Sequence, residues 1–259
     1  MKFNKGDLVT RESYNHDLVF KVVDYQDNLY ILRGLNIRLY ADSKEHDLKL
    51  SEDCNDLLED DDRFKVSLEG YLNTDRNQYF YLPGKILHID GDNEYLDRCM
   101  SFYKRANILA YGVYLNEHDM PGKLESYLRK VNPNIVIITG HDSFSDNQNI
   151  NNYRNSSSFI RSVKEAREYE KSHDKLIIIA GACQSNYEEL IKAGANFASS
   201  PRRVNIHALD PAIVASMISL TDSSKDIDLI GILEKTKYGS KGLGGIKTKG
   251  MMYVGYPRN

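Results

Sequence analysis

The chain has 259 residues, of which 41% are hydrophobic and 27% charged, as in a soluble globular protein that buries a core. Its net charge of −3, from Lys+Arg 34 against Asp+Glu 37, argues against a general electrostatic nucleic-acid binder. It has no apolar run of about 18 residues and no secretory signal, so we expect a cytoplasmic protein without membrane contact. The three cysteines, Cys54, Cys99 and Cys183, fit neither a disulfide framework nor a zinc pattern. No metal and no cofactor are expected.

The first 52 residues predict a small β-rich unit. Residues 7–11, 19–25 and 29–32 are rich in β-branched and aromatic side chains, and short polar turns separate them. Such tight spacing predicts an SH3-like β-barrel over residues 1–52. Residues 51–63 are strongly acidic, and we interpret residues 53–82 as an acidic connecting segment.

Residues 83–259 change to alternating strands and amphipathic helices. Residues 135–139 (IVIIT) and 176–180 (LIIIA) are continuous apolar runs, typical of strands buried on both faces of a parallel sheet. The alternation predicts an α/β domain with a doubly wound, mostly parallel sheet and flanking helices. The expected strands are residues 85–90, 108–115, 135–139 and 176–180, and the expected helices are residues 93–106, 122–131, 153–171, 186–193 and 211–220.

Residues 238–250 combine five glycines with several lysines, which predicts a flexible segment. A phosphate-binding loop at residues 242–245 is a weaker interpretation, because no strand–turn–helix pattern surrounds it.

Two chemically active residues follow the two apolar runs. His141 comes just after residues 135–139, and Cys183 comes just after residues 176–180. Ligands of open parallel sheets bind beyond the carboxyl ends of the strands, and neighbouring strands lie about 4.8 Å apart. We therefore expect these two side chains to face one cleft.

A cysteine beside a histidine is the pair that nucleophilic catalysis by a thiol requires. The helix expected from about residue 186 would further stabilise the thiolate of Cys183. The alternative is that Cys183 is a small buried hydrophobe and His141 a polar loop residue. Their joint placement at two strand ends favours the functional interpretation, whereas Cys54 and Cys99 lack such a setting.

In this chain an apolar strand followed by a histidine comes before an apolar strand followed by Ala-Cys. This order resembles that of the caspase-like cysteine peptidases. More closely, the chain resembles the YabG family of sporulation-specific peptidases, over most of its length. The segments that carry the resemblance are residues 5–11 (KGDLVTR), 13–17 (SYNHD), 139–142 (TGHD), 180–188 (AGACQSNYE), 193–201 (AGANFASSP) and 205–211 (NIHALDP).

The resemblance implies a caspase-like cysteine endopeptidase of the sporulating mother cell. Its substrates would be spore coat and related proteins, cut after Arg or Lys, and self-cleavage is expected. The glycine-rich segment would be either a regulatory flap or the site of self-cleavage, for which Lys237, Lys241, Lys247 and Lys249 would suit an enzyme that selects basic residues. The chain departs from the wider caspase pattern, in which a glycine follows the histidine, since here Gly140 precedes His141 and Asp142 follows it. The resemblance therefore supports His141 and Cys183 as the catalytic dyad more directly than it supports any assignment of the oxyanion hole.

The remaining site predictions follow from the chemistry of peptide cleavage. The first expected oxyanion donor is the backbone amide of Cys183, and the second is an amide of the loop from Gly140 to Asp142. Selection of basic residues needs a carboxylate, and Asp90 and Asp92 end the first expected strand. In a 2-1-3-4 strand order that strand lies beside the one before His141. The alternative is that these two acids only cap the next helix.

Two other functions remain open from the sequence. In a glutamine amidotransferase-like hydrolase the histidine follows the cysteine, so His207 would act, although Asp210 is poorly spaced for it. A non-enzymatic receiver- or flavodoxin-like regulator would need no reactive thiol. The N-terminal unit would bind a partner protein or the spore-coat surface, or would dock on the catalytic domain. The sequence leaves the oligomeric state open.

Overall fold

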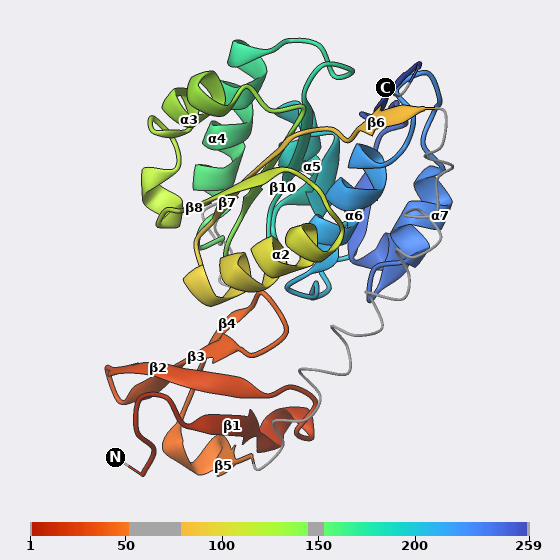
Figure 1. Cartoon of the computed structure of the whole chain (residues 1–259). Coiled ribbons are helices and arrows are strands. Elements are labelled where there is room, and N and C mark those ends of the chain that lie inside the picture. Colours follow the sequence, from red (N-terminus) through yellow and green to blue (C-terminus); the bar gives the residue numbers. More distant parts are fainter. Residues whose placement is uncertain (1, 52–78, 145–152, 258–259) are drawn as a thin grey trace.

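The computed structural model describes residues 2–51, 79–144 and 153–257, which form a small N-terminal sheet and a larger α/β unit (Figure 1). The acidic stretch and most of the predicted connecting segment lie outside the described residues. Among the helices of the described residues, none is long and apolar enough to cross a membrane.

The N-terminal sheet is antiparallel, with strand order β4-β3-β2-β1-β5. Its β-branched and aromatic side chains alternate, so that Val9, Phe20, Tyr30 and Leu32 are buried on one side. The predicted β-rich unit is confirmed at this level. Its elements are β1 (Leu8–Arg11), η1 (Glu12–Tyr14), β2 (Phe20–Gln26), β3 (Leu29–Gly34), β4 (Tyr40–Ser43), η2 (Glu45–Asp47) and β5 (Leu48–Leu50).

The larger unit is built on a sheet with strand order β12-β11-β10-β9-β7-β8. All neighbouring strands are parallel except β12, which runs antiparallel to β11. The predicted mostly parallel sheet and its 2-1-3-4 order are therefore confirmed. The strands are β7 (Ile86–Asp90), β8 (Ala110–Tyr114), β9 (Ile135–Thr139), β10 (Ile177–Ala180), β11 (Phe197–Ser199) and β12 (Leu243–Gly245).

Helices cover both faces of this sheet, which explains the continuous apolar runs. In β9, Ile135 and Ile137 pack with α2, α6 and α7, while Val136 and Ile138 pack with α3, α4 and α5 on the opposite face. The helices are α2 (Asn93–Arg105), η3 (Glu117–Asp119), α3 (Leu124–Val131), α4 (Ser156–Tyr169), α5 (Tyr187–Lys192), α6 (Asp210–Ser219), α7 (Leu229–Glu234) and η4 (Gly239–Lys241).

The prediction of a flexible glycine-rich segment is wrong for part of that segment. Leu243–Gly245 forms β12 and pairs with β11 in register from Phe197 to Ser199. Gly245 is needed there because a Cβ would lie 2.6 Å from the carbonyl oxygen of Asn196. A further small sheet joins β6 (Phe80–Leu82) to β13 (Tyr253–Gly255).

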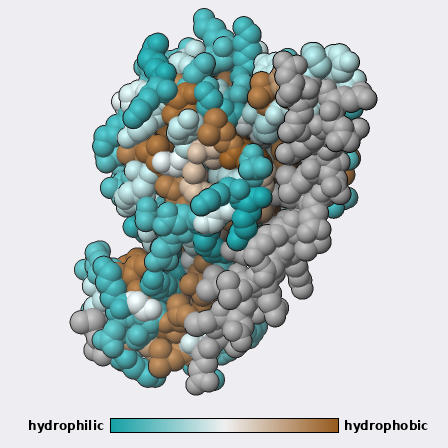
Figure 2. Space-filling model, viewed as in Figure 1, coloured by the Kyte–Doolittle hydropathy of each residue, from teal (hydrophilic) through white to brown (hydrophobic). Residues whose placement is uncertain are grey.

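The N-terminal sheet docks on the larger unit, as one of the alternatives anticipated. Its buried side chains form one apolar cluster with Cys183 and Ile206 of the larger unit. On the face in Figure 2, apolar residues are interspersed with polar ones over both units. Scattered exposed apolar side chains of this kind are ordinary for a folded surface.

Candidate active site

The loops that follow β7, β9 and β10 meet at the carboxyl edge of the parallel sheet. They carry Asp92, His141 and Cys183, and β7 itself ends at Asp90. All four side chains are buried. The structure thus places the predicted site residues at the edge where ligands bind in open α/β folds.

The ring of His141 is fully buried and held from several sides. Its Nε2 lies 2.7 Å from Oδ2 of Asp92, and its backbone amide donates to Oε1 of Glu117 at 2.9 Å. The rings of Tyr40 and Tyr95 lie 4.5 Å and 5.2 Å away between centroids. Because Nε2 faces a carboxylate, it carries the proton, and Nδ1 keeps its lone pair. This Nδ1 is buried, and it has no hydrogen-bond partner among the residues that the structure describes.

Asp92 holds His141 and at the same time begins α2. Its Oδ1 accepts from the backbone amides of Glu94 and Tyr95 at 2.9 Å and 3.1 Å, as an N-cap residue does. Its Oδ2 also accepts from Nη1 of Arg33, at 2.7 Å. Burial alone would raise the pKa of Asp92, but the hydrogen bond and charge of His141 and the charge of Arg33 hold that pKa well below its usual value. Asp92 is therefore an anion that fixes the orientation of the imidazole.

Cys183 is fully buried against the N-terminal sheet. Its Sγ accepts from the backbone amide of Ile206 at 3.2 Å and lies 3.6 Å from the Ile206 carbonyl oxygen. Burial raises the pKa of this thiol, and the Ile206 amide offsets only part of that effect. The next helix, α5, begins at Tyr187 with Asn186 as its N-cap, close to the expected start. Cys183 lies three residues before that cap, and its Sγ is bound by the Ile206 amide instead of by an amide of the helix start. Within the described residues, the thiol makes no hydrogen bond to His141.

The carboxylate of Asp142 ties the His141 loop to the Cys183 loop. It accepts from the hydroxyls of Ser156 and Ser185 at 2.5 Å and 2.8 Å. The Ser185 hydroxyl in turn accepts from the amide of Ala182 at 2.9 Å. Burial raises the pKa of Asp142, while these hydroxyl donors lower it. The side chain of Asp142 thus sets the spacing between the two loops.

The backbone groups predicted for the oxyanion hole face a segment of the N-terminal sheet. The amide of Cys183 donates to the carbonyl oxygen of Arg38 at 3.2 Å. Asp142 forms an isolated parallel bridge with Leu39. Gly140 leaves room for the carboxylate of Glu117, which would lie 2.5 Å from a Cβ at that position.

Asp90 binds a guanidinium group in the interior. Its carboxylate lies 2.9 Å and 3.0 Å from Nη1 of Arg38, and Nε2 of His88 lies 3.3 Å away. Burial alone would raise the pKa of Asp90, but Arg38 and His88 bring it below its usual value. The two acids predicted together therefore have different partners: Asp90 holds Arg38, and Asp92 holds His141.

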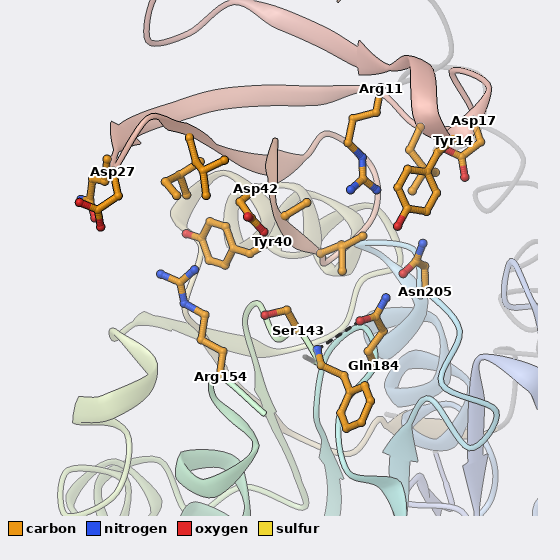
Figure 3. Close-up of a pocket in the computed structure, with 17 residues that line it drawn as sticks. Arg11, Tyr14, Asp17, Asp27, Tyr40, Asp42, Ser143, Arg154, Gln184 and Asn205 are labelled. Carbon is orange, nitrogen blue, oxygen red and sulfur yellow. Dashed lines mark hydrogen bonds between the residues drawn. The ribbon is translucent and has the colours of Figure 1, made fainter. Parts of the chain in front are cut away.

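A cavity of about 550 Å³ opens beside this edge, between the N-terminal sheet and the strand-end loops (Figure 3). Tyr40 and Asp42 face it from β4, and Ser143 and Gln184 face it from the loops after β9 and β10. The amide of Phe144 donates to Oε1 of Gln184 at 3.2 Å, which joins these two loops on the cavity floor.

Comparison with known proteins identifies the family. The profile of the YabG peptidase family U57 matches residues 4–257. The sporulation-specific protease YabG of Bacillus subtilis (strain 168) is 40% identical over 286 aligned residues, which cover 99% of each chain. The chain belongs to the YabG peptidase family. It is accordingly a protease of sporulation that acts on protein substrates.

Two solved structures resemble parts of the chain only loosely. Histidinol-phosphate aminotransferase from Clostridium acetobutylicum is 19% identical, with a TM-score of 0.28 over 54% of this chain and 45% of that one. The A domain of carboxylic acid reductase from Segniliparus rugosus is 11% identical, with a TM-score of 0.29 over 73% of this chain and 24% of that one.

Membership of the YabG family decides against the regulator and the amidotransferase as alternatives. The ring of His207 is engaged locally, since its Nδ1 accepts from the amide of Leu209 at 3.2 Å. Burial lowers the pKa of His207 well below its usual value, so this ring is neutral. Among the residues that the structure describes, no group of His, Cys, Asp or Glu side chains is arranged to hold a metal ion.

Sequence reasoning missed the contribution of the N-terminal sheet to the site. Arg33, Arg38 and Tyr40 all reach site residues of the YabG peptidase from the β3–β4 hairpin. One signal was available, because the two arginines interrupt a stretch from Leu29 to Tyr40 in which Asn36 is the only other polar side chain. An arginine inside an apolar stretch needs a buried acidic partner.

Proposed function

We propose that this chain is a cysteine endopeptidase in which Cys183 is the nucleophile and His141 the general acid–base. The observation that carries the proposal is the state of the His141 ring. Its Nε2 is held by Asp92, and its buried Nδ1 has a free lone pair at the sheet edge where Cys183 also lies. An imidazole fixed by an anion on one nitrogen and open on the other is the arrangement that proton transfer needs.

In the proposed reaction, Sγ of Cys183 bonds to the carbonyl carbon of the scissile peptide and the C–N bond breaks. His141 takes the thiol proton at Nδ1 and gives it to the leaving amine. Water then attacks the thioester, and His141 passes a proton from the water to the departing sulfur. The amide of Cys183, with an amide of the loop from Gly140 to Asp142, stabilises the oxyanion.

Specificity for Arg or Lys is assigned to Asp90. The carboxylate of Asp90 is buried and binds the guanidinium of Arg38, which supports its use as an acceptor for a basic side chain of a substrate. Asp92 was expected to share that role, but its contact with His141 supports a different assignment. We assign Asp92 as the residue that orients His141 and stabilises the imidazolium.

The wider proposals extend the family resemblance. The substrates are spore coat and related proteins, self-cleavage occurs, and the enzyme acts in the mother-cell cytoplasm. The α/β unit of residues 83–259 is assigned to the caspase-like class and residues 1–52 to the SH3-like class. The parallel sheet with His141 and Cys183 on successive strand ends supports the first assignment.

The test is cleavage of a peptide library by the purified wild type and three variants, Cys183→Ala, His141→Ala and His207→Ala. We expect cleavage after Arg or Lys by the wild type and by His207→Ala, and none by the other two variants. Mass spectrometry of the products gives both the rate and the cut position. Activity retained by a folded His141→Ala variant would remove the dyad.

A further inference from the structure

The five residues that connect β3 to β4, residues 35–39, lie across the candidate active site. Arg33 and Tyr40 pair on either side of this connection and close it as a hairpin. Arg38 within it is fully buried, with no exposed surface. Arginine is almost never so buried unless partners satisfy its charge and donors.

The backbone of residues 36–38 is bound as an added strand. The amide of Arg38 donates to the carbonyl oxygen of Ile206 at 3.2 Å, and the amide of Ala208 donates to the carbonyl oxygen of Asn36 at 2.9 Å. Between these bonds, Ile37 forms an antiparallel bridge with His207. Extended peptides are recognised in this way, through main-chain hydrogen bonds to the edge of a receptor segment.

The next peptide bond lies where the proposed reaction would occur. The carbonyl oxygen of Arg38 accepts from the amide of Cys183 at 3.2 Å, which is the first proposed oxyanion donor. On the other side of that bond, Leu39 lies beside Asp142, and the Tyr40 ring lies 4.5 Å from the His141 ring. The segment from Arg38 to Tyr40 therefore contacts the backbone of Cys183 at one end and the ring of His141 at the other.

The side chain of Arg38 fills a pocket made for a guanidinium. Besides the two contacts of Nη1 with Asp90, Nε and Nη2 donate to the carbonyl oxygen of Ala208 at 3.1 Å and 2.7 Å. The guanidinium carbon lies 5.0 Å from the centroid of the Tyr95 ring, and Nη2 lies 3.8 Å from Sγ of Cys99. A planar group with donors on two sides matches this pocket better than a lysine ammonium does.

We propose that residues 36–40 are an intramolecular pseudosubstrate: they occupy the substrate cleft with Arg38 in the arginine pocket and lower the activity of the peptidase by excluding substrate while they are bound. The inference rests on the proposed function and names an occupant of the same site. The N-terminal sheet is then the carrier that keeps this segment in the cleft. A substrate enters only after the hairpin leaves.

The hairpin explains why such a segment inhibits instead of being consumed. Pairing of β3 with β4 continues through Leu32–Ala41 and Ile31–Asp42, so both sides of a cut after Arg38 stay in place. The new amine would remain beside the acyl group and re-form the peptide bond. Burial of Cys183 also slows cleavage of the segment. Because burial raises the pKa of the thiol, the thiol stays protonated while the segment is bound.

The competing explanation is an ordinary ion pair between two docked units. An ion pair would account for Arg38 and Asp90 alone. It gives no reason for the amide of Cys183 to bind the carbonyl of the same residue, nor for the added strand at residues 206–208. The segment thus makes three contacts expected of a peptide substrate with arginine before the cut: its arginine binds Asp90, the carbonyl of that arginine binds the Cys183 amide, and its backbone pairs with residues 206–208.

The experiment compares hydrolysis of an internally quenched peptide containing one arginine by full-length variants. These are the wild type, Arg38→Ala, Arg38→Gln and, as a matched control, Lys44→Ala, which removes an exposed cation from the same hairpin region. Cys183→Ala is the blank. Arg38→Ala should raise kcat/KM by about tenfold or more, since it removes one partner of a buried charge pair. Arg38→Gln should raise kcat/KM less, and Lys44→Ala should leave it unchanged.

Peptide mapping of the wild type, quenched in denaturant after long incubation, gives a second result that needs no variant at position 38. We expect a fraction cut between Arg38 and Leu39 that is absent in Cys183→Ala. Folded Arg38 variants no faster than the wild type would overturn the pseudosubstrate while leaving the proposed function intact. So would a wild type that cuts other arginyl bonds of its chain but never this one. Absence of Cys183-dependent hydrolysis in every preparation would overturn both.

Discussion

The role assigned to Asp92 makes a quantitative prediction for Asp92→Asn. The substitution keeps the shape of the side chain and a good N-cap for α2, but removes the charge that faces His141 at 2.7 Å. An asparagine amide also donates to Nε2, which favours the tautomer that leaves Nδ1 without a lone pair. Asp92 is 5% exposed, so solvent screens this contact little. A hydrogen bond to a charged group is worth about 1.5–3 kcal/mol, so we expect kcat/KM to fall by about 10- to 150-fold.

The assay is hydrolysis of a single-arginine peptide, with thermal unfolding measured on the same samples. Glu94→Gln is the matched control, because Glu94 lies in the same first turn of α2 and also contacts Arg33, but does not touch His141. The control should keep kcat/KM within about twofold of the wild type, as for a surface ion pair. If Asp92→Asn folds and matches the control while His141→Ala is inactive, Asp92 does not orient the catalytic ring.

Three further predictions concern buried groups, two in the site and one, Asp210, at the start of α6. Asp90→Asn should lower turnover of arginine peptides by about tenfold or more, with little change for a peptide ester that lacks a basic residue. An equal loss of turnover on both substrates would contradict the role of Asp90 in specificity. Cys183 in the native wild type should react with iodoacetamide far more slowly than free cysteine at about pH 8, because burial raises the pKa of its thiol. Fast labelling of Cys183, found by peptide mapping, would contradict this. Burial raises the pKa of Asp210 from 3.8 to about 6, so its contribution to stability is present below pH 3.8 and is lost as the pH rises through about 6. The melting temperature of Asp210→Asn relative to the wild type should therefore increase from about pH 4 to about pH 7, and a constant difference would refute the shift.

The sequence predicted those parts of the fold that local pattern determines. The run at residues 135–139 coincides with β9, and the run at residues 176–180 includes β10, because strands buried on both faces need unbroken apolar stretches. The segment from Leu243 to Gly245 was predicted to be flexible, yet its glycines pair with β11. Close approach to Phe197 and Asn196 explains Gly245, and close approach to the Tyr187 ring explains Gly244; no local pattern encodes these contacts.

The site was predictable only where strand order brought residues together. His141 and Asp92 follow adjacent strands, so their proximity follows from the 2-1-3-4 order. The contacts of Arg33 and Arg38 depend on how a separate sheet docks, across 59 and 52 residues of chain. Such contacts arise from tertiary packing, which the periodicity of either segment does not encode.

The central claim is that Cys183 forms the covalent intermediate, and trapping that intermediate tests it most directly. The protein is acid-quenched while it hydrolyses an arginine ester, and the acyl group is located by peptide mapping, with Cys183→Ala and Cys99→Ala in parallel. We expect an acyl group on Cys183 in the wild type and in Cys99→Ala, and none in Cys183→Ala. An acyl group on another residue, or steady-state hydrolysis by Cys183→Ala at the wild-type rate, would contradict it.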